Sequence, residues 1–270
     1  GGVWRVVDTP GSSDTHLEVA GGPSERRWGT GTRVAMRAVR GVRNVRRDRD
    51  DERHQMSPVI DCTTEEGQGE GIAAAAAAIR RGELVVMPTD TVYGLCADAF
   101  APDAVTALLT AKGRGREMPP PVLVPSPRTV DGLATNVPAY ARDLIEAFWP
   151  GPLTLVLIAQ SSLMWDLGET NGTVALRMPK DDTALKLLDE VGPMAVSSAN
   201  VSGQTPAQTV LVAAAQLGSA VSVYLDVGPC PGALPSTILD CTGDSPVILR
   251  AGALSVGRVK EVLGEVELRN

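Results

Sequence analysis

After residue 55, short apolar segments alternate with stretches that have the spacing of amphipathic helices. The helical stretches cover residues 70–82, 102–112, 138–149, 182–192, 206–218 and 254–264. The strand-like segments cover residues 83–88, 121–125, 152–159, 172–179, 193–198, 221–226, 236–240 and 246–250. Such alternation is typical of a sheet covered by helices, and the cluster of late strands favours a mixed sheet. We therefore expect one α/β domain over residues 56–270.

Residues 1–55 have a different composition from the rest of the chain. They contain 11 Arg and no Lys against 8 acidic residues, a net charge of +3, whereas the remaining 215 residues carry 14 basic and 24 acidic side chains, a net −10. The segment shows no sustained helical or strand period, which is typical of disorder. We interpret residues 1–55 as a disordered or non-native extension, with Met56 as a natural start. The alternative is a basic arm that binds nucleic acid.

Several function classes are excluded by residues that the domain lacks. It contains no histidine after residue 55, so a Ser-His-Asp or Cys-His mechanism is not available. The P-loop, dinucleotide, zincin and nucleophile-elbow motifs are absent too. The four cysteines show no C-x-x-C spacing, which favours a reduced cytoplasmic protein without a metal site of its own. No apolar stretch reaches about 18 residues, so we expect no membrane span.

Polar loops follow the apolar segments, the place where ligands collect in open α/β sheets. The first loop, PTDTVYG over residues 88–94, contains Thr91. The second, AKGRGRE over residues 111–117, places Lys112, Arg114 and Arg116 within five residues of an otherwise acidic domain, which suits a polyanion such as a triphosphate. A strand-to-helix turn and a solvated helix end are the alternatives for these two loops.

Further polar residues lie at the ends of the later segments. They are Ser198 and Asn200 in AVSSAN, Thr173 and Arg177 in TVALRMP, Ser236 in PSTILD, and Arg250 in VILRAG. A turn cluster or a surface salt bridge would explain each of them singly. FWPGP over residues 148–152 reads as a rigid structural corner.

Taken in order, seven stretches resemble the YrdC-like family, the threonylcarbamoyl-AMP synthases, in a short single-domain form. The stretches are PTDTVYGL, KGR, FWPGPLTLVL, VALRMP, SSAN, STILD and ILRAG, between about residues 70 and 262. The resemblance implies a twisted, open mixed sheet with flanking helices around a deep basic cavity. This chain departs from the family at Gly115, where many relatives have Pro, and at residues 120–125, which lack the family's His.

The resemblance also implies an activity and its partners. A synthase of this family makes threonylcarbamoyl-AMP and pyrophosphate from L-threonine, bicarbonate and ATP, with Mg²⁺ on the ATP phosphates. The product serves the formation of threonylcarbamoyladenosine at position 37 of tRNA, which needs separate transfer proteins. Such a nucleotidyltransferase is expected in the cytoplasm.

The family's site residues carry over position by position. The implied threonine-binding residues are Thr91, Arg177 and Ser236. The implied ATP-binding residues are Lys112, Arg114, Thr173, Ser198, Asn200 and Arg250, of which Lys112 and Arg114 are the candidate catalytic residues. A carbamate that attacks a phosphorus atom needs alignment and charge neutralisation more than an acid or base, which suits a domain without histidine.

One alternative from another functional class stays open at this point. The same fold could serve as a module that binds tRNA or double-stranded RNA without adenylate synthesis. The net charge of −10 after residue 55 opposes this alternative, because an acidic surface repels a phosphate backbone.

Overall fold

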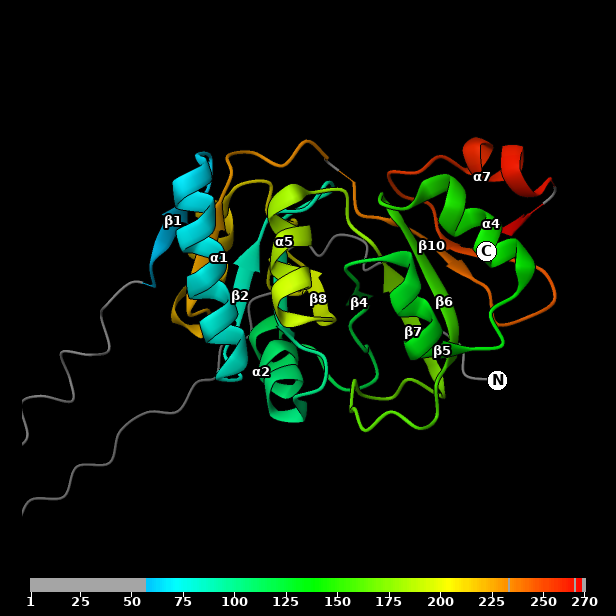
Figure 1. Ribbon diagram of the computed structural model, residues 1–270, viewed down its shortest axis with the longest axis horizontal. Coiled ribbons are helices and arrows are strands. Elements are labelled where there is room, and N and C mark those ends of the chain that lie inside the picture. Colours follow the sequence, from blue (N-terminus) through cyan, green and yellow to red (C-terminus); the bar gives the residue numbers. More distant parts are fainter. Residues whose placement is uncertain (1–56, 233, 265, 269–270) are drawn as a thin grey trace, which may run out of the picture. The chain divides into compact units, whose positions relative to one another are not determined.

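The computed structural model describes residues 57–232, 234–264 and 266–268 (Figure 1). The expected disordered extension, residues 1–55, lies outside this part of the chain. The helices are α1 (Glu65–Arg80), α2 (Pro102–Lys112), α3 (Val130–Leu133), α4 (Ala139–Phe148), α5 (Asp182–Val191), α6 (Val210–Leu217) and α7 (Val256–Leu263). The strands are β1 (Val59–Asp61), β2 (Val85–Met87), β3 (Gly94–Asp98), β4 (Val122–Leu123), β5 (Ala134–Thr135), β6 (Leu153–Ala159), β7 (Thr173–Arg177), β8 (Met194–Ser198), β9 (Val223–Asp226), β10 (Thr237–Asp240), β11 (Val247–Arg250) and β12 (Glu267–Leu268).

The strands form one mixed sheet in the order β1-β9-β2-β3-β8-β4-β7-β6-β10-β11-β12, and β5 pairs with β6. The sheet contains parallel pairs, such as β6 with β10, and antiparallel pairs, such as β3 with β8. The predicted mixed α/β sheet is therefore confirmed. The sheet brings strands that are far apart in sequence next to each other, so residues at their ends can form one site.

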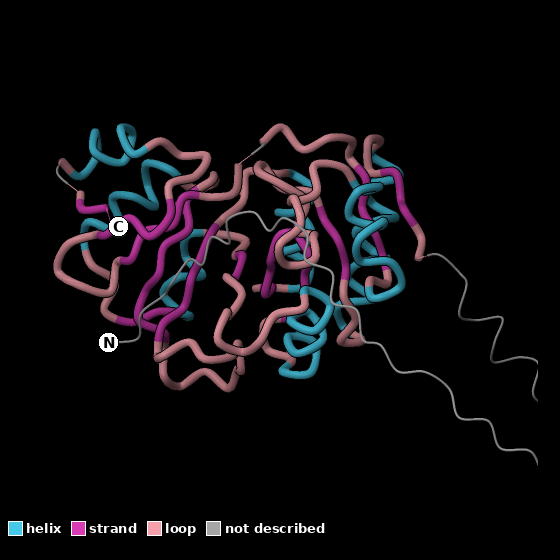
Figure 2. Tube along the Cα trace, turned by 180° about the vertical axis from the view of Figure 1, so that it is seen from behind, coloured by secondary structure: helices cyan, strands magenta, loops and turns pink. Residues whose placement is uncertain are grey.

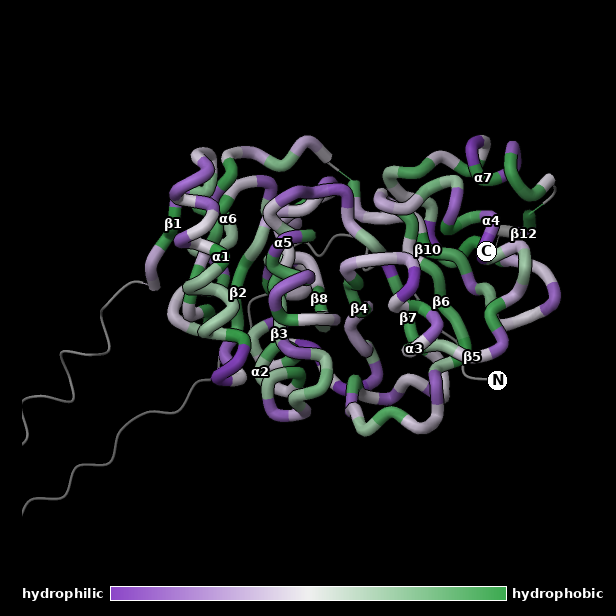
Figure 3. Tube along the Cα trace, in the orientation of Figure 1, coloured by the Kyte–Doolittle hydropathy of each residue, from purple (hydrophilic) through white to green (hydrophobic). Residues whose placement is uncertain are grey.

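Helices cover both faces of the sheet between β9 and β8. Val85 and Met87 of β2 pack in a cluster with α1 and α5, whereas Val86 packs with α2 and α6. Alternate residues of a strand point to opposite faces, so α1 and α5 lie on one face and α2 and α6 on the other. Figure 1 shows α1 and α5 in front of these strands, and the strands are coloured as apolar in Figure 3.

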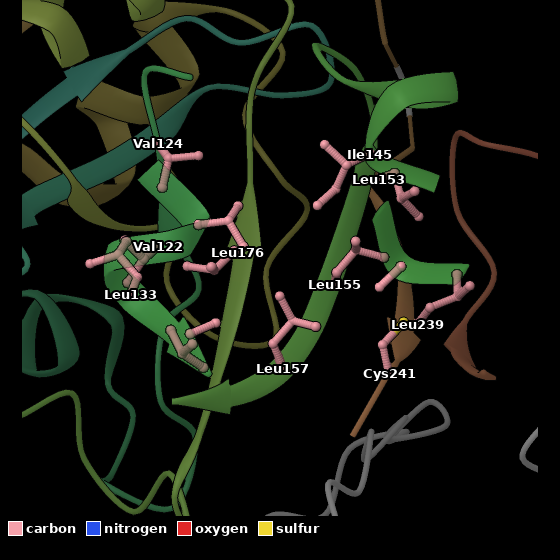
Figure 4. Packing of buried hydrophobic residues seen from close by; sticks show 14 of the residues in the cluster. Val122, Val124, Leu133, Ile145, Leu153, Leu155, Leu157, Leu176, Leu239 and Cys241 are labelled. Carbon is pink, nitrogen blue, oxygen red and sulfur yellow. The ribbon is translucent and has the colours of Figure 1, made fainter. Parts of the chain in front are cut away.

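A separate apolar cluster lies beneath α3, α4 and α7. Leu153, Leu155 and Leu157 of β6 are completely buried and project to the same side of the strand (Figure 4). Among the residues that they meet are Ile145 of α4 and Leu239 of β10. This aliphatic packing holds β6, β7 and β10 rigidly, and the candidate site is built at the ends of these strands.

One short feature differs from the sequence-based expectation. Residues 94–98, which we expected within a loop between a strand and a helix, form strand β3 against β2 and β8. The four cysteines are buried as free thiols, in line with the absence of a C-x-x-C motif. In the described part of the chain, no helix is both long and apolar enough to cross a membrane.

Candidate functional site

The loop between β2 and β3 is held in shape by its own hydroxyl groups. Thr89 Oγ1 donates to the main-chain oxygen of Val92 at 2.6 Å and accepts from the Thr91 N–H at 3.1 Å. The hydroxyls of Thr89 and Thr91 lie 3.0 Å apart, and both side chains are buried. This local bonding explains why the loop contains more polar residues than a simple turn needs.

Arg177, the last residue of β7, binds this loop from across the sheet. Its guanidinium forms an ion pair with Asp90, and its Nη1 donates to Thr91 Oγ1 at 3.1 Å. Its Nε donates to the main-chain oxygen of Gly151 at 3.0 Å. Burial lowers the pKa of Arg177 and the negative charge of Asp90 opposes that shift. Because an arginine keeps its proton in any protein environment, this is a buried cation with one carboxylate partner.

Arg250, the last residue of β11, lies against the start of β10. Its Nε and Nη2 donate to the main-chain oxygen of Ser236 at 3.0 and 2.8 Å. The Ser236 hydroxyl is 2.8 Å from that of Thr154 on β6. Burial lowers the pKa of Arg250 to about 10, and the positive charges of Arg177 and Arg114 contribute to the decrease. Arg250 is therefore close enough to two other guanidinium groups to be repelled by them.

Lys112 ends α2, where Gly113 takes the left-handed conformation with φ of 64°. The side chain is completely buried. Its Nζ donates to the main-chain oxygens of Ser198 and Asn200 and, at 3.1 Å, to Asn200 Oδ1. Burial, together with the positive charge of Arg114, lowers the pKa of Lys112 to about 7. The ammonium group of Lys112 thus donates its hydrogen bonds to the end of β8 and the loop that follows it.

Arg114 bridges the loop after α2 and the loop after β8. Its Nε donates to Ser202 Oγ at 2.8 Å, and its Nη1 lies 3.5 Å from Ser197 Oγ. Asn200, which is buried, closes the β8 loop by donating to the Gln204 carbonyl at 2.8 Å. The half-buried Arg114 has a lowered pKa because of its burial.

Four of the candidate cations form one electrostatic group, because, in addition to burial, the charge of Arg114 lowers the pKa of Lys112 and the charges of Arg177 and Arg114 lower that of Arg250. We call Lys112, Arg114, Arg177 and Arg250 the cation cluster. Among the described residues, Arg177 is the member with an ion pair, to Asp90, and the other three have no carboxylate within salt-bridge distance. Members of the cluster donate hydrogen bonds to the hydroxyl oxygens of Thr91, Ser198 and Ser236. A local excess of positive charge therefore exists in a domain that is acidic as a whole.

Thr173 is the candidate that the hydrogen bonds do not join to the cation cluster. It begins β7, whereas Arg177 ends the same strand. Its hydroxyl donates to the main-chain oxygen of Thr170 at 2.7 Å, within its own loop. Its assignment to ATP stays a prediction.

Four residues of the site had no role in the sequence-based hypothesis. Asp90 pairs with Arg177, and Ser202 accepts from Arg114. Gly151 belongs to the corner that we interpreted as structural, yet its carbonyl orients Arg177. No feature of the sequence indicated a role for Thr154, since a threonine within an apolar strand looks like any half-apolar core residue.

The described residues contain no cluster of three or more His, Cys, Asp or Glu side chains that could hold a metal ion. Asp90 is committed to Arg177. Asp181 caps α5 by accepting from the Ala184 N–H at 2.9 Å. Burial raises the pKa of Asp181, and the charge of Asp90 adds to the increase. Both carboxylates are therefore engaged by groups of the protein itself.

Comparison with known proteins identifies the family. The family model Sua5_yciO_yrdC, described as telomere recombination, matches residues 77–252. A protein of Mycobacterium leprae assigned as a threonylcarbamoyl-AMP synthase is 58% identical over 212 residues, which are 78% of this chain and 96% of that protein. The threonylcarbamoyl-AMP synthase of Bacillus subtilis is 38% identical over 200 residues, 73% of this chain and 58% of that protein.

The fold matches a solved structure as well. The structure of Pyrococcus abyssi Sua5 complexed with L-threonine superposes with a TM-score of 0.76 at 34% identity, covering 79% of this chain and 63% of that one. Sequence and fold thus agree over the same region. The chain belongs to the Sua5/YciO/YrdC family, the threonylcarbamoyl-AMP synthases.

Proposed function

We propose that this chain condenses L-threonine, bicarbonate and ATP into threonylcarbamoyl-AMP and pyrophosphate, with the cation cluster as its substrate site. The observation that carries the proposal is the meeting of three cations, which have no carboxylate partner among the described residues, with one buried Arg–Asp pair. The partly exposed charges of Arg114 and Arg250 suit the phosphates of a nucleotide, and the Arg–Asp pair suits an amino acid, which has both charges.

Threonine binds at Arg177. A guanidinium has five N–H groups, and three of those of Arg177 are used by Asp90, Thr91 and Gly151. The remaining two can donate to the substrate carboxylate. The hydroxyl of Thr91 and that of Ser236, which Arg250 contacts at 3.2 Å, supply further polar contacts for the amino acid.

ATP binds with its phosphates between Arg114 and Arg250. Both guanidiniums are partly exposed and can neutralise phosphate oxygens. Lys112 acts through its hydrogen bonds to Ser198 and Asn200, which hold these residues in place, and it adds its charge to the site. Lys112 is thus a positioning residue in this proposal, whereas Arg114 is a catalytic residue that touches the nucleotide.

The reaction needs no protein nucleophile. The threonine amine and bicarbonate combine with loss of water to give a carbamate, and a carbamate oxygen attacks the α-phosphorus of ATP. The bond from that phosphorus to the bridging oxygen of the β-phosphate breaks, and pyrophosphate leaves with the electron pair. Arg114 and Arg250 stabilise the charge that develops on the phosphate oxygens. Mg²⁺ held by the ATP phosphates would supply further charge neutralisation.

The product passes to other proteins in this proposal. Threonylcarbamoyl-AMP is a mixed anhydride that carries an activated acyl group, and the transfer to adenosine 37 of tRNA is the work of separate threonylcarbamoyl-transfer proteins. We place these steps in the cytoplasm.

Pyrophosphate release tests the proposed reaction. The chain should release pyrophosphate from ATP and Mg²⁺ only when threonine and bicarbonate are both present. Arg114→Ala and Arg177→Ala should each reduce the rate by about 100-fold or more, because each removes a fixed charge at the reacting centre. Arg142→Ala is the matched control, since Arg142 is exposed and pairs with Asp131. The proposal would be refuted if pyrophosphate were released at the same rate without threonine. Equal rates of release for all three variants would refute it too.

A further inference from the structure

The long connection between β6 and β7 is an anchored segment and not an open loop. It has no helix or strand between residues 160 and 172, and Figure 2 draws it as loop. Leu163, Trp165 and Leu167 nevertheless pack against the core that lies beneath α4, while Met164 between them is 91% exposed. This inward–outward alternation is that of an extended chain. We call residues 163–169 the strap.

The strap has a second anchor at the turn between β3 and α2. The ring of Trp165 stacks on that of Phe100, with the ring centroids 5.5 Å apart and the planes at 23°. Offset aromatic stacking at this distance favours one arrangement of both rings. The strap is therefore fixed at the turn that precedes α2.

The outward side of the strap binds the loop that contains Arg114. Asp166 forms an ion pair of 2.7 Å with Arg116, and the Glu169 N–H donates to the main-chain oxygen of Arg116 at 2.7 Å. Asp166 also accepts from the Gly168 N–H at 3.1 Å, which fixes the strap's own turn. One residue, Arg116, is thus bound through both its side chain and its backbone.

Gly168 makes this contact possible. Its φ is 104°, a conformation that side chains rarely adopt, and a Cβ at this position would lie 2.6 Å from the main-chain oxygen of Arg116. A larger residue would have to push the Arg116 backbone away. The sequence requirement for glycine here therefore comes from the close approach of the two loops.

Arg116 lies two residues from Arg114, in a stretch with little support of its own. Glycines at positions 113 and 115 leave that backbone without intrinsic stiffness. On one side the Arg114 N–H bonds the Leu109 carbonyl at 2.9 Å, and on the other side the strap binds Arg116. The strap thus fixes the C-terminal end of the segment 113–116, which contains Arg114, the proposed phosphate-binding cation.

We propose that Asp166 and Gly168 are positioning residues, which hold the 113–116 backbone so that Arg114 meets the phosphates of ATP. The inference rests on the proposed ATP-binding role of Arg114. It assigns a part in nucleotide affinity to a segment that contains none of the proposed substrate-binding residues.

Two glycine substitutions separate positioning from general strain. Gly168→Ala and Gly82→Ala both place alanine at positive φ, 104° and 77°, but the new Cβ of Gly82→Ala would meet nothing within 4 Å. Gly168→Ala should raise the KM for ATP between about 5- and 100-fold, because a displaced contact residue costs affinity. Its KM for threonine should change less than twofold, and Gly82→Ala should leave both constants unchanged.

A second pair of variants keeps the test decisive if Gly168→Ala does not fold. Asp166→Asn should raise the KM for ATP by about two- to fivefold, and Asp166→Glu should restore part of the loss, as expected for an exposed ion pair. Asp131→Asn, which removes another exposed pair with an arginine, should change nothing. Unchanged ATP affinity in Asp166→Asn, or an equal loss of ATP and threonine affinity in either strap variant, would overturn the inference.

Arg114→Ala distinguishes failure of this inference from failure of the proposed function. If Arg114→Ala abolishes activity while the strap variants keep the ATP affinity of the wild type, the strap is structural and the proposed function stands. If Arg114→Ala itself leaves ATP affinity unchanged, the phosphate-binding role of Arg114 is wrong and the strap inference fails with it.

Discussion

Replacement of Asp90 by asparagine removes the counter-charge of a buried guanidinium without changing the shape of the side chain. The side chains of Arg177 and Asp90 are 8% and 12% exposed. Asp90 also accepts from the Lys180 N–H at 2.9 Å, so that it joins the β2–β3 loop to the segment after β7. We expect Asp90→Asn to destabilise the fold as well as the threonine site.

The magnitude follows from the burial of the pair. Removal of one partner of a buried ion pair costs about 3–5 kcal/mol, because the other charge stays buried without compensation. Asparagine keeps one oxygen that can accept from Arg177, so we expect a loss of about 2–4 kcal/mol in the free energy of unfolding. Asp131→Asn, at an exposed pair, should cost less than about 1 kcal/mol.

Urea unfolding measures the effect directly. The midpoint should fall for Asp90→Asn while the slope of the transition stays that of the wild type. The double variant Asp90→Asn/Arg177→Met should regain much of the loss, because a buried pair replaced by neutral groups is often tolerated. The coupling energy of the two sites should be about 2 kcal/mol or more. Equal losses for Asp90→Asn and Asp131→Asn, or additive losses in the double variant, would refute the reasoning.

Further predictions follow from three other contacts. Gly232→Ala would place a Cβ 2.7 Å from the Thr91 Cα, so the KM for threonine should rise several-fold with little change for ATP, as separate titrations would show. Thr154→Val removes the hydroxyl bonded to Ser236 and should lower stability by about 1 kcal/mol in urea unfolding. The pKa of Lys112 is about 7 in the folded state and higher in the unfolded chain, so the unfolded state binds more protons above pH 7. The free energy of unfolding should therefore rise from pH 7 to 10 by more in the wild type than in Lys112→Met. Parallel curves of unfolding free energy against pH for the two proteins would contradict this.

Much of the fold follows from local patterns in the sequence. The helix expected over residues 102–112 is α2, because Pro102 suits a first turn and Gly113 suits a left-handed cap. The strand expected over residues 152–159 is β6, whose apolar run is long enough to be distinctive. Strands β1, β5 and β12 have only two or three residues, too few for a period to be seen.

The contacts of the site could not be predicted in the same way. The sequence indicated Arg177 as a binding residue, but its partner Asp90 lies 87 positions earlier. Ser236 and Thr154 are separated by 82 residues and meet only because β10 pairs with β6. The alternative of a solvated helix end is wrong for Lys112, because the loop after β8 binds its ammonium group and the side chain is buried. Such partners depend on the strand order, which no local pattern records.

Detection of the adenylate tests most directly whether the cation cluster joins nucleotide and amino acid. The chain is mixed with ATP, Mg²⁺, threonine and ¹³C-labelled bicarbonate, and the products are analysed by mass spectrometry. We expect labelled threonylcarbamoyl-AMP from the wild type and from Arg142→Ala, and none above background from Arg114→Ala. Labelled adenylate formed equally well by Arg114→Ala, or no adenylate from the wild type, would contradict the claim that the cation cluster joins nucleotide and amino acid.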